Sequence, residues 1–241
     1  MSTSDTASNI LRDKLHAVQA RIAKACADSG RPGSSVQLLA VSKTFSADDV
    51  RQVAAFGQRD FGENYIQEGV DKIIALQGQT PALVWHCIGP IQSNKTKLVA
   101  EHFDWAHTVD RLKIAQRLND QRPAHLAPLN VCLQVNIDGG ETKSGIAPVE
   151  VLALAAEVSK LPRLTLRGLM TIPDPVDGFE RQLAVHAKAR ALFDEVKAAL
   201  NLPQFDTLSM GMTGDLEAAV QAGSTMVRVG TAIFGGRHYK I

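Results

Sequence analysis

The residue with the clearest chemistry is a lysine at the end of the first predicted strand. The apolar run 36–42 predicts this strand, and Lys43 follows it on the same face as Leu39 and Val41. A lysine amine that is partly shielded from water can lose its proton and form a Schiff base with an aldehyde. A single lysine at a strand end is most often only a solvated charge, so Lys43 needs support from other residues.

Two later stretches combine glycine with serine or threonine directly after predicted strands. They are SMGMTGDLEAA, from Ser209 to Ala219, and VRVGTAIFG, from Val227 to Gly235. Small residues let backbone N–H groups approach a phosphate, and the start of a following helix favours an anion. Each glycine alone could simply make a tight turn, but two such loops in succession favour a phosphate site.

Arg228 lies between Val227 and Val229 in the last predicted strand. If the valines face surrounding helices, strand alternation directs the guanidinium to the opposite face. A buried guanidinium needs hydrogen-bond partners, which could be an internal carboxylate, Asn136 or an acceptor on a bound ligand. Together with Lys43 and the two loops, Arg228 describes a ligand with an aldehyde, a phosphate and a ring acceptor.

Other polar residues suggest weaker hypotheses. His86 and His107 lie in adjacent predicted strands, but a third ligand at useful spacing is missing. We therefore interpret both as hydrogen-bonded core residues and expect no metal. Asp174, Asp177 and Glu180 follow the sixth predicted strand and could act as acids or bases, but they are more typical of loop and helix-start carboxylates.

These candidates occupy regular places in an alternation of strands and helices. Apolar residues at helical spacing predict a first helix over 5–29. Eight short apolar runs then alternate with helical stretches. The predicted strands cover 36–42, 59–61, 83–88, 105–109, 129–136, 164–172, 207–210 and 225–229.

Eight strand–helix pairs predict an α/β fold, the (β/α)₈ or TIM barrel, with functional residues at the carboxyl ends of the strands. The apolar runs are typical of parallel strands that are covered on both faces. A doubly wound open sheet is the alternative, but it usually places a Gly-rich turn after the first strand. We expect a single domain over 1–241, with the barrel over 36–235 after the extra N-terminal helix.

The composition excludes several functional classes. The chain has 241 residues, with 26 Lys and Arg against 25 Asp and Glu, which argues against a nucleic-acid platform or a polybasic membrane binder. No apolar run is long enough to span a bilayer, and the N-terminus has no export or organelle signal. The three cysteines are widely separated and form no CxxC, which suits a reducing cytoplasm.

The motifs also resemble those of a known family. The chain is similar to the pyridoxal-phosphate homeostasis proteins, a YggS-like group related to the N-terminal barrel of alanine racemase. The matching stretches span nearly the whole chain in order, which makes the resemblance more specific than any one motif. They are LLAVSKT, FGENYIQE, WHCIGPIQSNKTK, VDRLKIA, KSGI, LRGLMTIP, LSMGMTGDLEAA and VRVGTAIFG.

The resemblance implies that Lys43 carries pyridoxal 5′-phosphate (PLP) as an internal aldimine and that Arg228 meets the pyridine nitrogen. It further implies phosphate contacts and ring contacts from both loops and two inner strands. The phosphate contacts are Ser209, Gly230 and Thr231, with the Met212 backbone nearby, and the ring neighbours are Asn64 and Met170. The chain departs from the family pattern at Thr213-Gly214, where a serine and an acidic residue are expected.

Three functions are compatible with these residues. The leading hypothesis is a protein that holds PLP as a Schiff base on Lys43 and releases it to PLP-accepting apo-enzymes, without enzymatic turnover or catalytic residues, as a monomer or weak dimer. Lys143 is a second amine that could receive PLP, or simply a solvated loop lysine. The alternatives are a single-domain PLP-dependent amino-acid racemase and a Schiff-base aldolase acting on sugar phosphates.

The racemase hypothesis needs a second base opposite Lys43. Related racemases take this base, a tyrosine, from an added C-terminal β-domain. The chain ends at Ile241, soon after the eighth predicted strand, and its tyrosines are Tyr65 and Tyr239. We therefore expect a cofactor face that is open to solvent, without a closed catalytic chamber.

Overall fold

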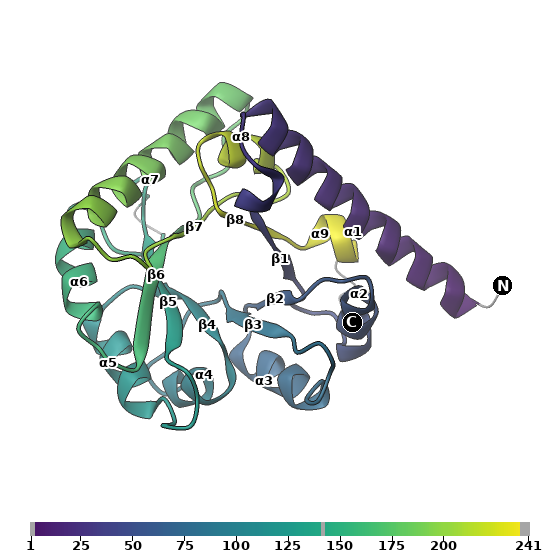
Figure 1. The fold of residues 1–241 in the computed structure, drawn as a ribbon, viewed down its shortest axis with the longest axis horizontal. Helices are drawn as coiled ribbons and strands as arrows, with labels where there is room; N and C mark the ends of the chain where they lie inside the picture. Colours follow the sequence, from purple (N-terminus) through teal and green to yellow (C-terminus); the bar gives the residue numbers. More distant parts are fainter. Residues whose placement is uncertain (1–2, 141–142, 237–241) are drawn as a thin grey trace.

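The strands of this protein lie side by side in parallel and close on themselves. The computed structural model describes residues 3–140 and 143–236, and the first strand pairs with both the second and the eighth to complete the barrel (Figure 1). The strands are β1 (Gln37–Val41), β2 (Asp60–Glu63), β3 (Val84–Cys87), β4 (Trp105–Val109), β5 (Leu129–Val135), β6 (Leu164–Thr171), β7 (Thr207–Ser209) and β8 (Met226–Val229).

Helices follow the strands and surround the barrel (Figure 1). They are α1 (Thr3–Asp28), α2 (Ala47–Ala55), α3 (Ile66–Ala75), α4 (Thr96–His102), α5 (Leu112–Gln121), α6 (Val151–Val158), α7 (Phe179–Leu200), α8 (Leu216–Gln221) and α9 (Thr231–Phe234), with short 3₁₀ turns at Gly33–Ser35 and Pro148–Glu150. The predicted TIM barrel with its extra N-terminal helix is therefore confirmed. None of the described helices is both long enough and apolar enough to cross a membrane.

Strand alternation separates two cores. On β1, Leu38 and Ala40 belong to the large cluster between the strands and the helices, whereas Leu39 and Val41 pack in a second cluster with Ile88 and Met226. Burying these side chains stabilises the fold by roughly 25 cal/mol for each Å² of apolar surface removed from water. The same alternation on β8 turns its two valines toward the helices and its arginine toward the barrel axis.

Several elements begin or end a few residues from their predicted bounds, and one helix was not predicted. The second strand was expected over 59–61 but runs from Asp60 to Glu63, because Gly62 and Glu63 pair with β3, which the local pattern does not reveal. Helix α9 was not predicted, since its four residues are too few to show a helical period.

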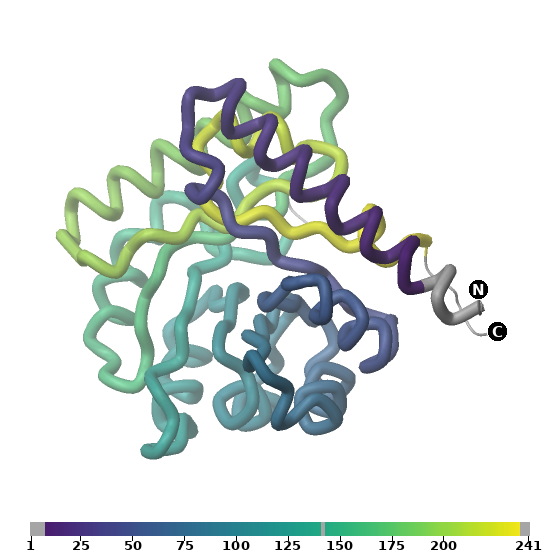
Figure 2. The backbone as a smooth tube through the Cα atoms, turned by 45° about the vertical axis from the view of Figure 1, so that its right-hand side comes forward, coloured from purple at the N-terminus to yellow at the C-terminus, as the bar shows by residue number. Residues whose placement is uncertain are grey.

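The N-terminal helix α1 lies across the outside of the barrel beside α8 and α9 (Figure 2). Its residues Leu15, Val18 and Ile22 are buried. Arg21 on its outer side donates to both carboxylate oxygens of Glu217 at 2.9 Å and to the Thr213 carbonyl at 3.0 Å. The helix therefore contacts the loop that follows β7.

Candidate functional site

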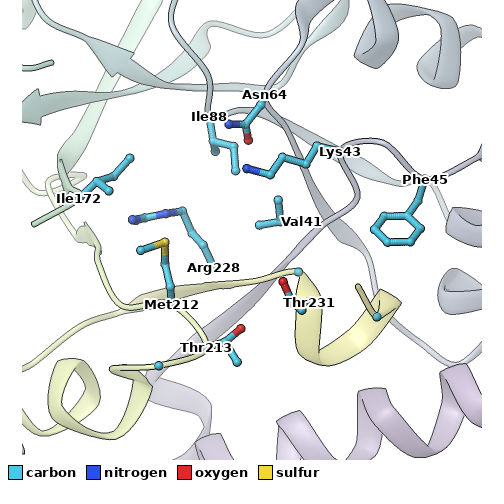
Figure 3. A pocket seen from close by; sticks show the side chains of 13 residues that line it. Val41, Lys43, Phe45, Asn64, Ile88, Ile172, Met212, Thr213, Arg228 and Thr231 are labelled. Atoms are coloured by element: carbon cyan, nitrogen blue, oxygen red, sulfur yellow. The ribbon is translucent and has the colours of Figure 1, made fainter. Parts of the chain in front are cut away.

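A cavity of about 320 Å³ opens at the carboxyl ends of the strands. Most of the residues that line it belong to segments that follow β1, β2, β3, β6, β7 and β8, and two lie near the carboxyl ends of β1 and β8 themselves (Figure 3). They are Val41, Lys43, Phe45, Asn64, Ile88, Ile172, Met212, Thr213, Gly214, Arg228, Gly230, Thr231 and Gly235. Six of the predicted site residues therefore meet in one place, which is where barrels bind ligands.

Lys43 follows β1 and is partly buried. Its side chain extends into the cavity between Val41, Asn64 and Ile88, and the Arg228 guanidinium lies across the same space (Figure 3). An amine with apolar walls and a cation nearby is in the setting that favours attack on a carbonyl.

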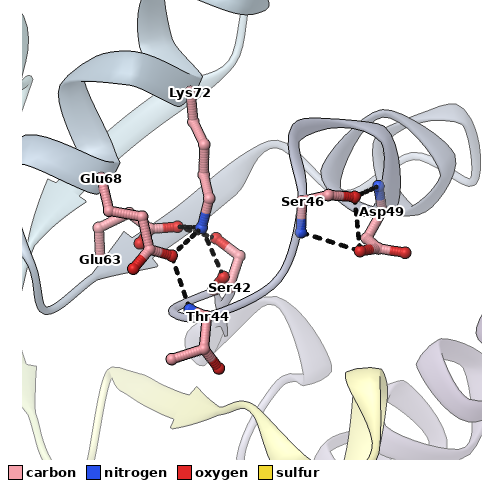
Figure 4. A network of polar contacts seen from close by, with 7 residues as sticks. All are labelled: Ser42, Thr44, Ser46, Asp49, Glu63, Glu68 and Lys72. Carbon is pink, nitrogen blue, oxygen red and sulfur yellow. Dashed lines mark hydrogen bonds and ion pairs between the residues drawn. The ribbon is translucent and has the colours of Figure 1, made fainter. Parts of the chain in front are cut away.

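The turn that carries Lys43 has an unusual backbone. Thr44 has a φ of 68°, in the left-handed region that β-branched residues avoid. The Thr44 N–H donates to Glu68 at 2.6 Å (Figure 4). Such strain persists only where the surrounding structure holds it, so this hydrogen bond helps to fix the direction of the Lys43 side chain.

A buried cation holds the other side of the same turn. Lys72 on α3 donates to the Ser42 carbonyl at 2.7 Å, and it forms ion pairs with Glu63 at 2.7 Å and with Glu68 at 2.6 Å (Figure 4). The Ser42 hydroxyl donates to Glu63 at 2.6 Å. Burial raises the pKa of Glu63, and the Lys72 ammonium partly offsets this effect. We call Ser42, Thr44, Glu63, Glu68 and Lys72 the turn network.

Helix α2, which begins just after the turn network, is fixed by hydrogen bonds of its own. The Ser46 hydroxyl accepts from the Asp49 N–H at 3.1 Å, and the Asp49 carboxylate accepts from the Ser46 N–H at 2.9 Å (Figure 4). This reciprocal pair is a capping box, which satisfies backbone donors at the helix start. Both ends of the segment that carries Lys43 are therefore held by specific hydrogen bonds.

Arg228 points into the barrel, as the alternation predicts, and its residue exposure is only 4%. It donates to the Ser209 hydroxyl and to the Thr171 carbonyl, each at 2.8 Å. Both partners are neutral oxygens, in place of the carboxylate or Asn136 that the sequence left open. Burial lowers the pKa of Arg228 to about 10, so the guanidinium stays charged at neutral pH.

The loop after β7 is held close to the cavity by contacts that require glycine. Gly211 has a φ of 92°, and a Cβ there would lie 2.4 Å from the Ala219 Cβ. The Met212 N–H donates to Asp215 at 2.6 Å, and Asp215 also accepts from His186 at 2.9 Å. These hydrogen bonds outweigh the effect of burial and lower the pKa of Asp215.

Two of the predicted site residues lie outside the cavity lining. Ser209 and Met170 do not line the cavity, because they face the barrel axis one layer below it. The Ser209 hydroxyl is already bonded to Arg228 and His107, while Met170 packs against Trp105 and Cys132. The Ser209 hydroxyl is thus engaged beneath the cavity, and its contact with a phosphate stays a prediction. Met212 lines the cavity, but its N–H is already used by Asp215.

Several lining residues were not among the predicted site residues. Thr213 and Gly214 lie beside Met212 in the loop where the sequence departs from the family pattern, and that departure was the available signal. Phe45, Ile88 and Ile172 contribute apolar walls. No local pattern distinguishes these apolar residues from the core, because only the closure of the barrel brings them to the cavity.

The remaining candidates lie elsewhere. His86 and His107 are buried inside the barrel and hydrogen-bonded, as interpreted. Lys143 forms an ion pair with Asp174 at 2.8 Å and donates to the backbone carbonyl of Ile172, directly after β6, at 3.3 Å. Tyr65 is exposed at the start of α3, and Tyr239 lies outside the described residues.

Comparisons with known proteins agree with this architecture. Residues 14–238 match the sequence model of the alanine racemase N-terminal domain, and the chain belongs to this family. Curated relatives include the pyridoxal phosphate homeostasis protein of Escherichia coli strain K12, which is 54% identical over 96% of this chain and 98% of its own length. The protein of the same name from Pasteurella multocida strain Pm70 is 53% identical over 95% of this chain and 98% of its own.

Solved structures show the same barrel. PipY of Synechococcus elongatus PCC7942, determined with PLP bound, has a TM-score of 0.81 and 35% identity over 93% of this chain and all of its own. An alanine racemase of Clostridium difficile 630 has a TM-score of 0.74 at 16% identity, and the match covers 97% of this chain and 58% of the racemase. At that identity the racemase shows a shared fold alone.

Proposed function

We propose that this protein binds PLP covalently through Lys43 and takes part in PLP homeostasis by holding and releasing it. The observation that carries this proposal is the convergence of Lys43, Arg228 and the loops after β7 and β8 on one cavity. PLP supplies an aldehyde that condenses reversibly with a primary amine. The names of the curated relatives and the PLP-bound PipY structure support the same ligand.

The chemistry of the cavity fits PLP. Lys43 offers an amine, and Arg228 has N–H groups for a ring acceptor. Asn64 lines the cavity, and its Oδ1 is buried without a hydrogen-bond partner in the protein, a state that costs free energy unless a ligand or water completes it. Thr213, Gly214, Gly230 and Thr231 leave room for a phosphate at their backbone.

Arg228 also supports binding over catalysis. Its pKa of about 10 keeps the guanidinium charged, so it donates to a ring nitrogen and disfavours protonation of that nitrogen. An unprotonated ring is a weaker electron sink for carbanion chemistry. Among the described residues that line the cavity, Arg228 is the titratable group besides Lys43, and its charged guanidinium does not serve as a second base. We therefore favour a carrier over a racemase.

The proposal extends to the setting of the protein. Cys26, Cys87 and Cys132 are free thiols in the structure, and each is buried, which suits a reducing cytoplasm. Release of PLP to apo-enzymes would require access to the cavity, which is open at the carboxyl ends of the strands. We propose a cytoplasmic monomer or weak dimer that passes PLP to apo-enzymes.

The visible spectrum of the purified protein with PLP tests this function. We expect a band of bound PLP that borohydride fixes to Lys43, located by mass spectrometry of peptides. Lys43→Ala should abolish the band and the fixed adduct, whereas Lys143→Ala, which changes an amine outside the cavity, should keep both. A retained adduct elsewhere in Lys43→Ala would overturn the assignment. Formation of D-isomers from L-alanine, L-serine or L-lysine at ordinary enzymatic rates would contradict a carrier.

A further inference from the structure

A column of polar side chains crosses the interior of the barrel below the cavity. His86 bonds Asp60 at 3.0 Å and His107 at 2.9 Å, and His107 bonds the Ser209 hydroxyl at 3.1 Å. Ser209 in turn accepts from Arg228 at 2.8 Å. We call these five residues, contributed by β2, β3, β4, β7 and β8, the interior column.

The interior column connects the cavity with the opposite end of the barrel. Asp60 is the first residue of β2, whereas the cavity lies at the carboxyl ends of the strands. The His86, His107 and Ser209 residues are fully buried, and the Asp60 side chain is 15% exposed. The Trp105 ring stacks on His86 at 5.2 Å between ring centroids. The hydrogen bonds therefore lie in a dry interior, where they are stronger than in water.

The donors of the interior column have one consistent direction. The Asp60 carboxylate can only accept, so His86 Nε2 carries the hydrogen of that bond. With one hydrogen on each ring, His86 Nδ1 then accepts from His107 Nε2, and His107 Nδ1 is an acceptor. The Ser209 hydroxyl must donate to His107, which leaves its oxygen lone pairs for Arg228. Burial above all, and then the Arg228 charge, lower the pKa of His107 well below its usual value, in agreement with a neutral ring at His107.

We propose that Asp60, His86 and His107 act through Ser209 as positioning residues for Arg228. The carboxylate at the far end of the barrel sets both histidine tautomers, so that Ser209 always offers Arg228 an acceptor and never a competing donor. Together with the Thr171 carbonyl, this fixes the guanidinium and leaves for the ligand the N–H groups that bond neither Ser209 nor Thr171. The inference rests on the proposed function in one respect, since it takes the ligand of Arg228 to be the ring of PLP.

Two measurements on the full-length protein test the interior column. Nitrogen-15 NMR of the imidazole rings, without PLP, should show the Nε2–H tautomer for His86 and His107. Asp60→Leu, which removes the acceptor, should add the Nδ1–H tautomer at His107, while Asp60→Asn, which keeps a carbonyl oxygen, should not. An Nδ1–H tautomer at His107 in the wild-type protein, or no change in Asp60→Leu, would overturn the proposal.

The second measurement concerns bound PLP. Ser209→Ala, the least disruptive change, should shift the absorbance maximum of bound PLP and raise its dissociation constant about fivefold, an effect of one well-placed hydrogen bond. Cys132→Ala, a truncation in the same interior that leaves the interior column intact, should leave the absorbance maximum in place. If Ser209→Ala matches the wild type while PLP still binds Lys43, the positioning role fails and the proposed function stands. If the wild type binds no PLP, the proposed function fails, and the NMR result still decides the tautomers.

Discussion

Arg228 places a full positive charge inside the barrel, where its two protein partners are neutral oxygens. Burying a charge without a contacting counter-ion costs several kcal/mol, even after structural relaxation, and the Asp215 carboxylate, which raises the pKa of Arg228 without bonding it, offsets this only in part. A residue that served only stability would be replaced at little cost by an apolar side chain of similar volume. Arg228 is therefore best explained by a ligand that needs its N–H groups, and the same holds at a smaller cost for the buried Asn64 oxygen.

The lowered pKa of His107 predicts how the stability of the protein depends on pH. The folded pKa of His107 lies well below the value of 6.5 that it has when unfolded, because of burial, His86 and Arg228. Below pH 6.5, His107 binds a proton in the unfolded chain but stays neutral in the folded chain. The free energy of unfolding should therefore fall as pH decreases, by about 1.4 kcal/mol for each pH unit from this residue.

Urea unfolding between pH 7 and pH 5 measures this contribution. The non-titrating variant His107→Gln should lose this part of the pH dependence, so that its stability curve is flatter than that of the wild type. His125→Gln serves as the control, because His125 belongs to the loop before β5 and makes no contact with the interior column. Parallel curves for the wild type and His107→Gln would contradict the assignment.

At the scale of elements, the position of Lys43 depends on contacts between β1, β2 and α3. Lys72 comes from α3 and contacts the backbone of the turn after β1, while Glu63 comes from the end of β2. The Lys72 ammonium is surrounded by two carboxylates and a carbonyl. These contacts hold Lys72 beside the turn and outside the cavity, which Lys43 lines.

Removal of the Lys72 charge should disturb both stability and the turn. Lys72→Met leaves the Glu63 carboxylate buried without its cation and should cost about 3–5 kcal/mol in the free energy of unfolding, measured in urea. Formation of the Lys43 adduct with PLP should also slow, because the Ser42 and Thr44 backbone loses its support.

Two further variants serve as controls for the effect of Lys72→Met on stability. Lys97→Met removes an exposed partner of Glu101 at 3.7 Å and should change stability by less than about 1 kcal/mol. The double variant Lys72→Met/Glu63→Gln should recover part of the loss, because the uncompensated charge is gone. A Lys72→Met protein as stable as Lys97→Met would show that the turn network does not hold the fold.

At the scale of the whole molecule, the first helix supports a loop that lies almost at the other end of the chain. Arg21 on α1 donates to the Thr213 carbonyl and to Glu217 on α8. Arg31, just after α1, donates to the Val220 and Ser224 carbonyls next to β8. The N-terminal helix is thus part of the support of the cavity, as well as a cover for the barrel.

This support predicts an effect at a distance. Arg21→Met should weaken PLP binding about two- to fivefold, because the Thr213 loop loses a hydrogen bond, while stability falls by only about 1 kcal/mol at this partly exposed site. Equilibrium titration with PLP measures the change. Lys24→Met, which removes an exposed pair with Asp28 on the same helix, is the control. Equal PLP affinities in the two variants would contradict a role for α1 in the site.

Much of this architecture could be predicted from local patterns. The fourth strand was predicted over 105–109 and is observed over Trp105–Val109, because a run of buried residues between turn signals needs only its neighbours to be recognised. The inward direction of Arg228 followed from its two flanking valines for the same reason. Lys43 followed from its place directly after an apolar run, and the structure puts it in the cavity.

What the sequence by itself determined was therefore the series of elements and the side of each strand on which a residue lies, since both depend on periods of two or 3.6 residues. Only the tertiary structure decided which side chains meet. Ser209 is hydrogen-bonded to His107, which is 102 residues away, and to Arg228. Its hydroxyl is therefore engaged in the barrel interior, beneath the cavity. Lys72 finds Glu63 and Ser42 because α3 packs beside β2 and Lys72 reaches the turn after β1. Such partners depend on the register and closure of the barrel, which no local period encodes.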